Sequence, residues 1–323
     1  MYILIMPVKD EEKILCDVIE SIINQIVKPV LWLIVDDGST DSSPKIIQDF
    51  VSKYYWIKTI QLPPHPRDII YHVSYVYKCG FDHILKYCDD NKIYYNFIAS
   101  IDADTILETE YFEKILHKFE TNEKLGIASG GLYHEIDGNL TLSTKVENFP
   151  SGTGRVWSKK CFFDTGGFSL EPSADSISNI KATLRGWDTK RFNEIQMVEK
   201  RLTSSAEGLW NGYKCNGYMS YYLNKNPILI LLGVFQYTLR KPYYIGIAFL
   251  WGYIVSFIKR EERTKDKEIR EYFWTQRLIE YKNMVIKRIK SLVPHIQYFT
   301  NWIKKSSSFI PISKYFSVKC LKS

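Results

Sequence analysis

Two aspartates with one residue between them, Asp102 and Asp104, follow a short apolar run, Phe97–Ile101. Residues i and i+2 of an extended chain point to the same side, so both carboxylates can face one point beyond the end of this strand. Two acids this close repel each other unless a cation or hydrogen-bond donors neutralise them. Because hard divalent cations bind carboxylates and phosphates together, the pair indicates a metal site for a nucleoside diphosphate. The alternative is a solvated turn, with Thr105 and Glu108 as a capping box for the next helix.

The elements that must position these acids alternate in type along the first 110 residues. Apolar, β-branched runs predict buried strands, and apolar residues at the spacing i, i+3, i+4 and i+7 predict helices between them. This alternation implies right-handed crossovers and a mostly parallel sheet with helices on both faces, which is an α/β fold. The predicted strands are Tyr2–Met6, Leu31–Val35, Ile57–Leu62 and Phe97–Ile101, and the predicted helices span 15–26, 43–53 and 69–87.

Two further acids stand at an equivalent place, because Asp36 and Asp37 directly follow the predicted strand Leu31–Val35. Open α/β sheets bind ligands in the crevice beyond the carboxyl ends of their strands. We therefore expect all four aspartates to lie at one edge of the sheet.

The pattern changes after residue 110. Strands are predicted at Ile127–Tyr133 and Asn139–Thr144, on either side of the turn signal Asp137–Gly138. A helix is predicted at Ser176–Leu184 and a further strand at Lys190–Val198.

Two apolar stretches follow Pro227, Ile228–Phe235 and Tyr243–Ile258. A helix needs about 20 apolar residues to span a bilayer, so neither stretch is long enough alone. Both are flanked by Tyr, Trp, Lys or Arg, which favours a pair of helices at a membrane interface; the alternative is a buried helical hairpin. The expected domains are 1–225 (a nucleotide-binding half, 1–110, and an acceptor half, 111–225), an apolar helical hairpin, 226–260, and a basic helical tail, 261–323.

The charge of the chain is unevenly distributed. The net charge is +7, but Lys259–Ser323 alone holds 16 basic and 6 acidic residues, and no acid occurs from Tyr281 onward. Lys and Arg beside an apolar segment are attracted to anionic lipid by about 1 kcal/mol per residue. We recognise no nucleic-acid-binding module, so the expected anionic partner is a membrane surface and not a nucleic acid.

The six cysteines are scattered, with neither zinc-type nor redox spacing, which is typical of reduced cysteines in the cytosol. The first strand begins at Tyr2 without a basic segment or cleavage site before it, so no signal peptide is expected. The expected location is therefore cytoplasmic, peripheral on the cytoplasmic face of the membrane.

Three blocks of the sequence, taken together, resemble the family 2 glycosyltransferases with the GT-A fold. They are Ile3–Glu11, Ile34–Asp41 and Ile101–Thr105, and their order and spacing match the family. The resemblance covers at least residues 1–200. It implies a Rossmann-like GT-A sheet, and transfer of a sugar from a nucleotide-activated donor, a UDP- or GDP-sugar, with inversion at the anomeric carbon.

The resemblance also implies how the nucleotide is held. Members of the family hold the nucleoside at the positions of Pro7 and Glu11. Lys9 stands where relatives often have an aromatic residue, and we expect it to contact phosphate. Asp36 or Asp37 is expected to accept a hydrogen bond from the base or the ribose, and Gly38 allows the tight turn beside them.

A divalent cation, Mn²⁺ or Mg²⁺, is the implied cofactor. Asp104 is expected to bind it, and Asp102 to bind the ribose or to reach the metal through water. Arg67 is expected at a phosphate or the base. Relatives often complete the metal shell with a His on the strand after a Gly-Trp pair; this chain has no His there, and Glu199 is the expected oxygen ligand in its place.

An inverting transfer needs a base on the face opposite the leaving group, to take the proton of the acceptor hydroxyl. Relatives carry an acid after a Gly-Gly-Phe-like turn, at the start of a helix. Asp175 follows Gly166–Phe168 in this way and is the first candidate. Glu171 and Asp188 are weaker candidates, and the alternative role for Asp175 is a helix N-cap.

The loop Ser151–Trp157 lies where relatives line the acceptor site, which implies acceptor contacts for Gly154, Arg155 and Trp157. Trp157 would offer an apolar face to a sugar ring, or else belong to the core. The expected acceptor is a hydroxyl of a glycan or of a lipid-linked sugar.

Two other functions stay open at this point. A nucleotidyltransferase also combines a parallel sheet with a carboxylate-held metal, but it would need a Gly-rich, basic loop after the first strand, where Val8–Glu12 is acidic. A degenerate, non-catalytic glycosyltransferase-like protein that binds a membrane partner is the second alternative, because Ala174 replaces the first acid of the usual Glu-Asp pair.

Overall fold

The structure is a computed structural model that describes residues 1–64, 72–136, 138–143, 146–200 and 208–286. The chain divides into two compact units, Met1–Arg270 and Glu271–Ser323. In the second unit the described residues include a π-helical turn, Tyr272–Gln276. The division at residue 225 that the sequence suggests falls inside the first unit and stays a prediction.

The parallel half of the sheet follows the alternation of elements in the sequence. Its strands are adjacent in the order β3-β2-β1-β4, and each pairs in parallel with its neighbour. These strands are β1 (Tyr2–Val8), β2 (Leu31–Asp36), β3 (Ile57–Gln61) and β4 (Phe97–Ser100), and the helices between them are α1 (Leu15–Ile23), α2 (Ser43–Lys53) and α3 (His72–Asp90).

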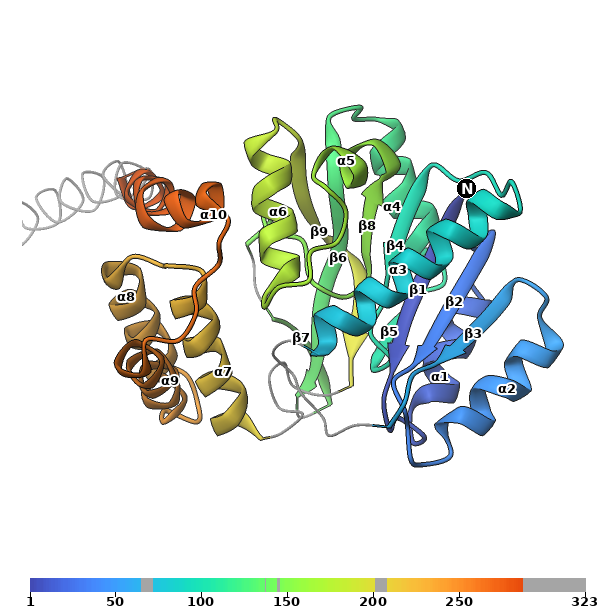
Figure 1. Cartoon of the computed structure of the whole chain (residues 1–323), viewed down its shortest axis with the longest axis horizontal. Helices are drawn as coiled ribbons and strands as arrows, with labels where there is room; N and C mark the ends of the chain where they lie inside the picture. The colour runs from blue at the N-terminus through green and yellow to red at the C-terminus, as the bar shows by residue number, and fades with distance from the viewer. Residues whose placement is uncertain (65–71, 137, 144–145, 201–207, 287–323) are drawn as a thin grey trace, which may run out of the picture. The chain divides into compact units, whose positions relative to one another are not determined.

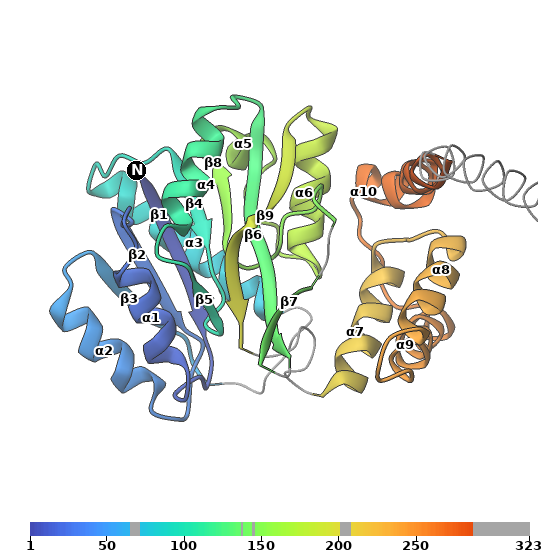
Figure 2. The ribbon, with the colours of Figure 1, turned by 180° about the vertical axis from the view of Figure 1, so that it is seen from behind.

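Helices cover both faces of this sheet, as Figures 1 and 2 show from opposite sides. Strand β1 is buried except at Pro7, and its alternate side chains enter two different cores. Tyr2, Leu4 and Met6 pack with residues of α1, α2 and α4 (Tyr111–Glu120), while Ile3 and Ile5 pack with residues of α3. This confirms the predicted α/β architecture.

The other half of the sheet mixes strand directions. The order continues β4-β8-β6-β9-β5, with β7 paired to β6 alone. Strand β8 is antiparallel to β4 and β6, β6 and β9 are parallel, and β5 is antiparallel to β9. The elements are β5 (Thr105–Leu107), β6 (Leu125–Ile136), β7 (Asn139–Leu142), β8 (Arg155–Ser158), α5 (Lys159–Asp164), α6 (Ala174–Leu184) and β9 (Asp188–Glu199).

The C-terminal part of the first unit is helical. It comprises α7 (Leu209–Tyr222), α8 (Pro227–Thr238), α9 (Ile245–Lys259) and a short α10 (Lys267–Glu271) that ends at the boundary of the two units. The two predicted apolar helices are thus present as α8 and α9, whereas α7 has no clear sequence signal. In the part of the chain that the structure describes, none of the helices has the length and apolar character needed to cross a bilayer.

Candidate functional site

The loop after β2 presents the first pair of aspartates. Asp36 and Asp37 are buried, and the Asp36 carboxylate accepts a hydrogen bond from the backbone N–H of Ser39 at 3.0 Å. Gly38 adopts φ +65°, and a Cβ at this position would lie 2.6 Å from the Cα of Pro64. Only glycine fits such a turn against neighbouring backbone, so this loop has a fixed shape.

The loop after β1 is tied to the loop after β2. The Lys9 ammonium donates to the backbone carbonyl of Asp37 at 2.7 Å, and the N–H of Glu11 donates to the hydroxyl of Ser43 at 2.9 Å. Glu11 is buried and Pro7 half-buried. The structure therefore brings together the predicted nucleotide contacts of both loops, while Arg67 lies outside the described residues.

A histidine that the sequence analysis did not select joins this group. His72, at the start of α3, lies with its Nε2 2.8 Å from a carboxylate oxygen of Asp37. The two residues are 35 positions apart, so no local pattern links them. The only available signal was a His in the first turn of the predicted helix 69–87.

The second pair of aspartates stands at the end of β4. Asp104 is buried and Asp102 half-buried, and Thr105 begins strand β5, so the capping box proposed for Thr105 and Glu108 is not formed. The backbone N–H of Asp102 donates to the hydroxyl of Thr153 at 2.9 Å. The Asp-x-Asp segment is thus a turn between β4 and β5, but it is largely buried and not solvated.

Tyr77, on α3, orients one of these carboxylates. Its hydroxyl donates to Asp102 at 2.5 Å. Burial raises the pKa of Tyr77 well above its ordinary value, and the negative charge of Asp102 raises it further. Tyr77 therefore stays protonated at neutral pH and donates to a carboxylate that remains an acceptor.

Strand register places both aspartate pairs at one edge of the sheet, which confirms the expected convergence. Val8 is aligned with Asp36 across β1 and β2, and Ile5 with Ser100 across β1 and β4. Strands β2 and β4 are therefore separated by two inter-strand spacings, about 9–10 Å.

Glu199 reaches this edge from the antiparallel half of the sheet. It is paired with Thr105 across β5 and β9, and the N–H of Lys200 donates to the carbonyl of Asp104 at 2.9 Å. On its other side, Glu199 lies 3.5 Å from Nε2 of His134, which β6 supplies. His134 is thus a second histidine that the sequence analysis missed, because only strand pairing brings it here.

The residues around Asp104 suit a hard cation by their chemistry. Asp102, Asp104 and Glu199 offer carboxylate oxygens, the donors that Mn²⁺ and Mg²⁺ prefer. Among the described residues, however, no three His, Cys, Asp or Glu side chains are grouped closely enough to hold a metal ion by themselves. Phosphate oxygens of a nucleotide would supply the remaining ligands of such a cation.

Asp175 lies in the first turn of α6. The N-cap position is Ser173, so the alternative role of Asp175 as the N-cap is not observed. Ser173 adopts φ +59°, a left-handed conformation that is uncommon for residues other than glycine and often marks functional sites. A Cβ at Gly152 would lie 3.6 Å from a carboxylate oxygen of Asp175, so this carboxylate faces the loop before β8.

Arg155 holds that loop and α6 together. It is fully buried, and its guanidinium donates to the backbone carbonyls of Ser151 (2.8 Å), Pro150 (2.9 Å) and Asp175 (3.0 Å). Burial lowers the pKa of Arg155 to about 10, so the side chain remains a cation at neutral pH. The structure thus makes Arg155 a positioning residue for Asp175.

The segment expected to be an acceptor-lining loop is partly a central strand. Residues 155–158 form β8 because they pair with both β4 and β6. Trp157 is buried, and its indole N–H donates to Ser178 at 2.9 Å, which supports the core alternative for this residue. Gly154 adopts φ +59°, with its carbonyl bonded to the hydroxyl of Tyr111. A direct acceptor contact of Gly154, Arg155 or Trp157 stays a prediction.

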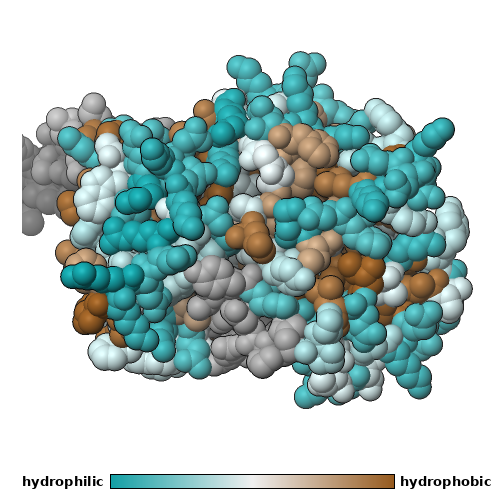
Figure 3. Space-filling model, viewed as in Figure 1, coloured by the Kyte–Doolittle hydropathy of each residue, from teal (hydrophilic) through white to brown (hydrophobic). Residues whose placement is uncertain are grey.

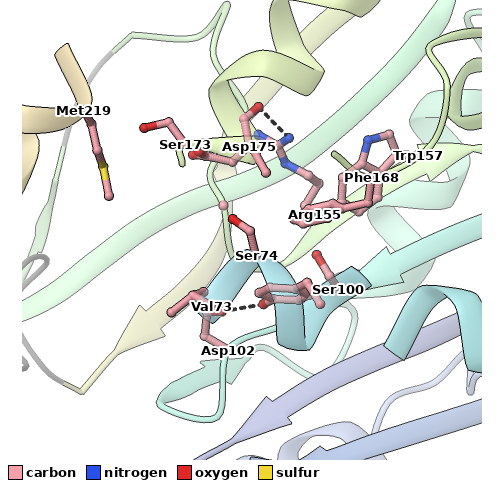
Figure 4. A pocket seen from close by; sticks show the side chains of 13 residues that line it. Val73, Ser74, Ser100, Asp102, Arg155, Trp157, Phe168, Ser173, Asp175 and Met219 are labelled. Carbon is pink, nitrogen blue, oxygen red and sulfur yellow. Dashed lines mark hydrogen bonds between the residues drawn. The ribbon is translucent and has the colours of Figure 1, made fainter. Parts of the chain in front are cut away.

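A pocket of about 190 Å³ joins the two sides of the site. It is lined by Asp102 and Ser100 from the end of β4, by Asp175 and Ser173 from the start of α6, and by Phe168. Figure 4 shows Asp102 and Asp175 on different sides of this pocket. An acid that can hold a nucleotide and an acid that can accept a proton thus face the same space.

The two weaker base candidates are engaged elsewhere. The Glu171 carboxylate accepts hydrogen bonds from Tyr222 (2.9 Å) and Thr264 (2.6 Å). Asp188 is exposed at the start of β9 and accepts from Asn122 at 3.0 Å. Neither residue lines the pocket that contains Asp175.

Comparison with solved structures identifies the fold. The mannosyltransferase PcManGT from Pyrobaculum calidifontis, in complex with GDP-Man and Mn²⁺, is similar with a TM-score of 0.56 and 12% identity, over 81% of this chain and 88% of that one. The S. aureus TarS 1–349 structure in complex with UDP-GlcNAc has a TM-score of 0.49 and 14% identity, over 68% of this chain and 65% of that one. The match to PcManGT shows that the α/β architecture is that of the GT-A glycosyltransferases.

Sequence comparison adds a curated relative and a family. The minor teichoic acid biosynthesis protein GgaA of Bacillus subtilis (strain 168) is 24% identical over 221 residues, which make up 64% of this chain and 46% of that protein. The chain thus spans about half the length of this relative. The model of glycosyl transferase family 2 matches residues 3–175, which run from β1 through both aspartate pairs to Asp175. With more than half of its length matched in this way, the chain belongs to glycosyl transferase family 2 and is a glycosyltransferase.

Proposed function

We propose that this enzyme transfers a sugar from a UDP- or GDP-sugar to a hydroxyl of a glycan or lipid-linked acceptor, with inversion and with the help of Mn²⁺ or Mg²⁺. The observation that carries the proposal is the pocket that Asp102 and Asp175 share. Asp102 follows β4, beside the predicted nucleotide loops, and Asp175 lies in the first turn of α6, beside the predicted acceptor segment.

In this proposal the first half of the chain binds the donor. Asp36 or Asp37 accepts hydrogen bonds from the base or ribose, and Glu11 and Asp102 contact the ribose. Lys9 lies between the loops after β1 and β2, and in this proposal its ammonium contacts a phosphate of the donor. Asp104 would hold the divalent ion, with Asp102 and Glu199 as further oxygen donors and phosphate oxygens of the nucleotide as the remaining ligands. When bound, that ion supplies a Lewis acid that neutralises the charge developing on the departing diphosphate.

Asp175 acts as the base in the transfer step. Its carboxylate takes the proton of the acceptor hydroxyl as that oxygen bonds to the anomeric carbon. The bond between this carbon and the diphosphate oxygen breaks on the opposite face, and a nucleoside diphosphate leaves. Arg155 holds the start of α6 to the neighbouring loop, so Asp175 keeps its direction during the step.

Family membership argues against the nucleotidyltransferase alternative. A nucleotide-sugar donor is supported by PcManGT, which has a similar fold and whose structure contains GDP-Man. A glycan or polymer acceptor is supported by the similarity to GgaA, a protein of minor teichoic acid biosynthesis.

The direct test is a thermal-shift titration of the full chain with UDP and GDP, each with and without MnCl₂. We expect one nucleotide to raise Tm by about 2–4 °C near 100 times its Kd, and only when metal is present. An equal shift without metal would contradict the metal-held diphosphate. With a panel of nucleotide sugars, a complete lack of both transfer and donor hydrolysis would instead support the non-catalytic alternative.

We also propose that α8 and α9 rest on the cytoplasmic face of an anionic membrane. Apolar side chains at helical spacing remain 39% to 72% exposed on these two helices. The face drawn in Figure 3 is mainly hydrophilic, with hydrophobic side chains in separate patches. Basic residues stand at the ends of both helices, which favours a lipid surface over a neutral protein partner. The exposed apolar residues are Ile228, Leu231, Phe235, Ile247, Trp251, Ile254 and Ile258, and the basic residues are Arg240, Lys241, Lys259 and Arg260.

Replacing Phe235 and Trp251 together by glutamate should weaken binding to vesicles of phosphatidylglycerol and phosphatidylcholine by at least about tenfold, because large apolar side chains each contribute roughly 1.5–3 kcal/mol on burial. Co-sedimentation measures this effect. Tyr55→Glu is the matched control, because Tyr55 is 88% exposed on the GT-A part of the chain. Unchanged vesicle binding of the double variant would refute a lipid role for this surface. A wild type that is dimeric in solution and a double variant that is monomeric would refute it as well.

A further inference from the structure

A second and larger cavity lies beside the proposed base. Its volume is about 670 Å³, and β6, α6 and β9 line it together with α7 and the segment between α8 and α9. Gly152 and Asp175 line this cavity as well as the smaller pocket that contains Asp102. A ligand in the larger cavity would therefore reach Asp175 from the side away from the predicted donor loops.

Arg191, on β9, is the most unusual residue of this cavity. Only 8% of its surface is exposed, and its Nε and Nη1 are buried without a hydrogen-bond partner. Burial lowers the pKa of Arg191, which shows how far its charge is removed from water. The negative charge of Asp175 attracts this cation, yet Nε and Nη1 receive no hydrogen-bond acceptor from it. A buried guanidinium with unsatisfied N–H groups destabilises a fold, so such a group is typically kept for a ligand that pairs with it.

The other polar groups of the cavity are complementary to an anion that carries hydroxyl groups. Arg240 and Lys241 add two exposed cations, and Asp175 is the only acid among the described residues that line the cavity. Asn179 is buried; its amide N–H donates to Pro150, while its side-chain oxygen has no donor. That oxygen is placed to accept from a hydroxyl, as the guanidinium is placed to donate to an anion.

We propose that this cavity binds an anionic group, a phosphate or a carboxylate, on a hydroxyl-rich acceptor, and that Arg191 pairs with it. The cavity then directs a neighbouring hydroxyl of the acceptor toward Asp175. This inference rests on the proposed function, in which Asp175 is the base. It deepens that function by assigning the acceptor a negative charge close to the reacting hydroxyl.

The test compares Arg191→Met, which removes the charge at similar length, with Arg191→Lys, which keeps it. Dissociation constants are measured by ligand-observed NMR on the full chain, for glycerol 3-phosphate against glycerol and for glucuronate against glucose. The wild type should bind at least one anion roughly tenfold more tightly than its neutral counterpart, as expected for a charge-assisted hydrogen bond. Arg191→Met should lose that preference, and Arg191→Lys should keep part of it. Which of the two anions shows the preference distinguishes phosphate from carboxylate.

Thermal stability separates a binding role from a structural one. Without ligand, Arg191→Met should leave Tm unchanged or raise it, because a buried charge with two unsatisfied nitrogens is removed. A large fall in Tm, or an anion preference that survives in Arg191→Met, would overturn the proposal.

Nucleotide affinity separates this proposal from the proposed function. Both variants should bind UDP or GDP as the wild type does; weaker nucleotide binding by Arg191→Met would assign Arg191 to the donor and refute the inference. A wild type that binds nucleotide but shows no anion preference would overturn only the inference. A wild type that binds no nucleotide at all would overturn the proposed function.

Discussion

Replacing Asp175 by asparagine is expected to slow sugar transfer by about 10²–10⁴-fold, the range that general base catalysis contributes. Asparagine has the same shape but cannot take the proton of the acceptor hydroxyl. The backbone carbonyl of Asp175, which accepts from Arg155, is unchanged by this substitution, so the start of α6 should keep its place. Initial rates of product formation with saturating donor measure the effect.

The matched control is Asp188→Asn, the same chemical change on an exposed acid outside the pocket. It should transfer at the wild-type rate. Asp175→Asn should also keep the metal-dependent affinity for the nucleotide, because Asp175 stands on the other side of the pocket from Asp102. Full transfer by Asp175→Asn, or loss of transfer in Asp188→Asn alone, would assign the base to another residue.

The second large effect is expected for Asp104→Asn. A metal at the diphosphate contributes several kcal/mol to the transition state, which corresponds to a loss of roughly a thousandfold in transfer rate. Unlike Asp175→Asn, this variant should also lose the Tm increase that nucleotide and Mn²⁺ produce together. Asp49→Asn, an exposed acid on α2, is the control that should change neither quantity.

The two variants thus predict different patterns of loss. Asp104→Asn should lose both metal-dependent nucleotide binding and transfer, whereas Asp175→Asn should lose transfer alone. If Asp104→Asn keeps the metal-dependent shift at the wild-type size, the cation is held elsewhere and the site must be redrawn.

The sequence was sufficient to predict the nucleotide half of the fold because its signals are local. Each parallel strand is an uninterrupted apolar run, and acids or turn residues mark its end, so Asp36 and Asp102 could be placed at one edge before any coordinates. Strand β8 escaped prediction because Arg155–Ser158 has only two apolar residues, which is too few to stand out as an apolar run. Residues 155–158 are extended only through pairing with β4 and β6, which are distant in sequence.

The side chains that support the site escaped prediction for a similar reason. Tyr77 and His72 both lie on α3, 25 and 35 residues from the aspartates that they contact. His134 meets Glu199 only through the pairing of β6 with β9. Arg191 was part of a predicted strand, but the burial of its Nε and Nη1 without hydrogen-bond acceptors results from tertiary packing, which the periodicity of the sequence does not reveal. Partners of this kind follow from tertiary contacts and not from spacing along the chain.

The hydrogen bonds of Glu171 have a mechanical consequence. This carboxylate, four residues before Asp175, accepts from Tyr222 at the end of α7 and from Thr264 beyond α9. A tilt of α7 and α9 against the sheet would stretch both hydrogen bonds. The orientation of these helices is therefore coupled to the position of Asp175 at the start of α6. If α8 and α9 rest on a membrane as proposed, these hydrogen bonds would fix the distance between the lipid surface and Asp175. That distance would set how long a lipid-linked carrier must be for its terminal hydroxyl to reach the base.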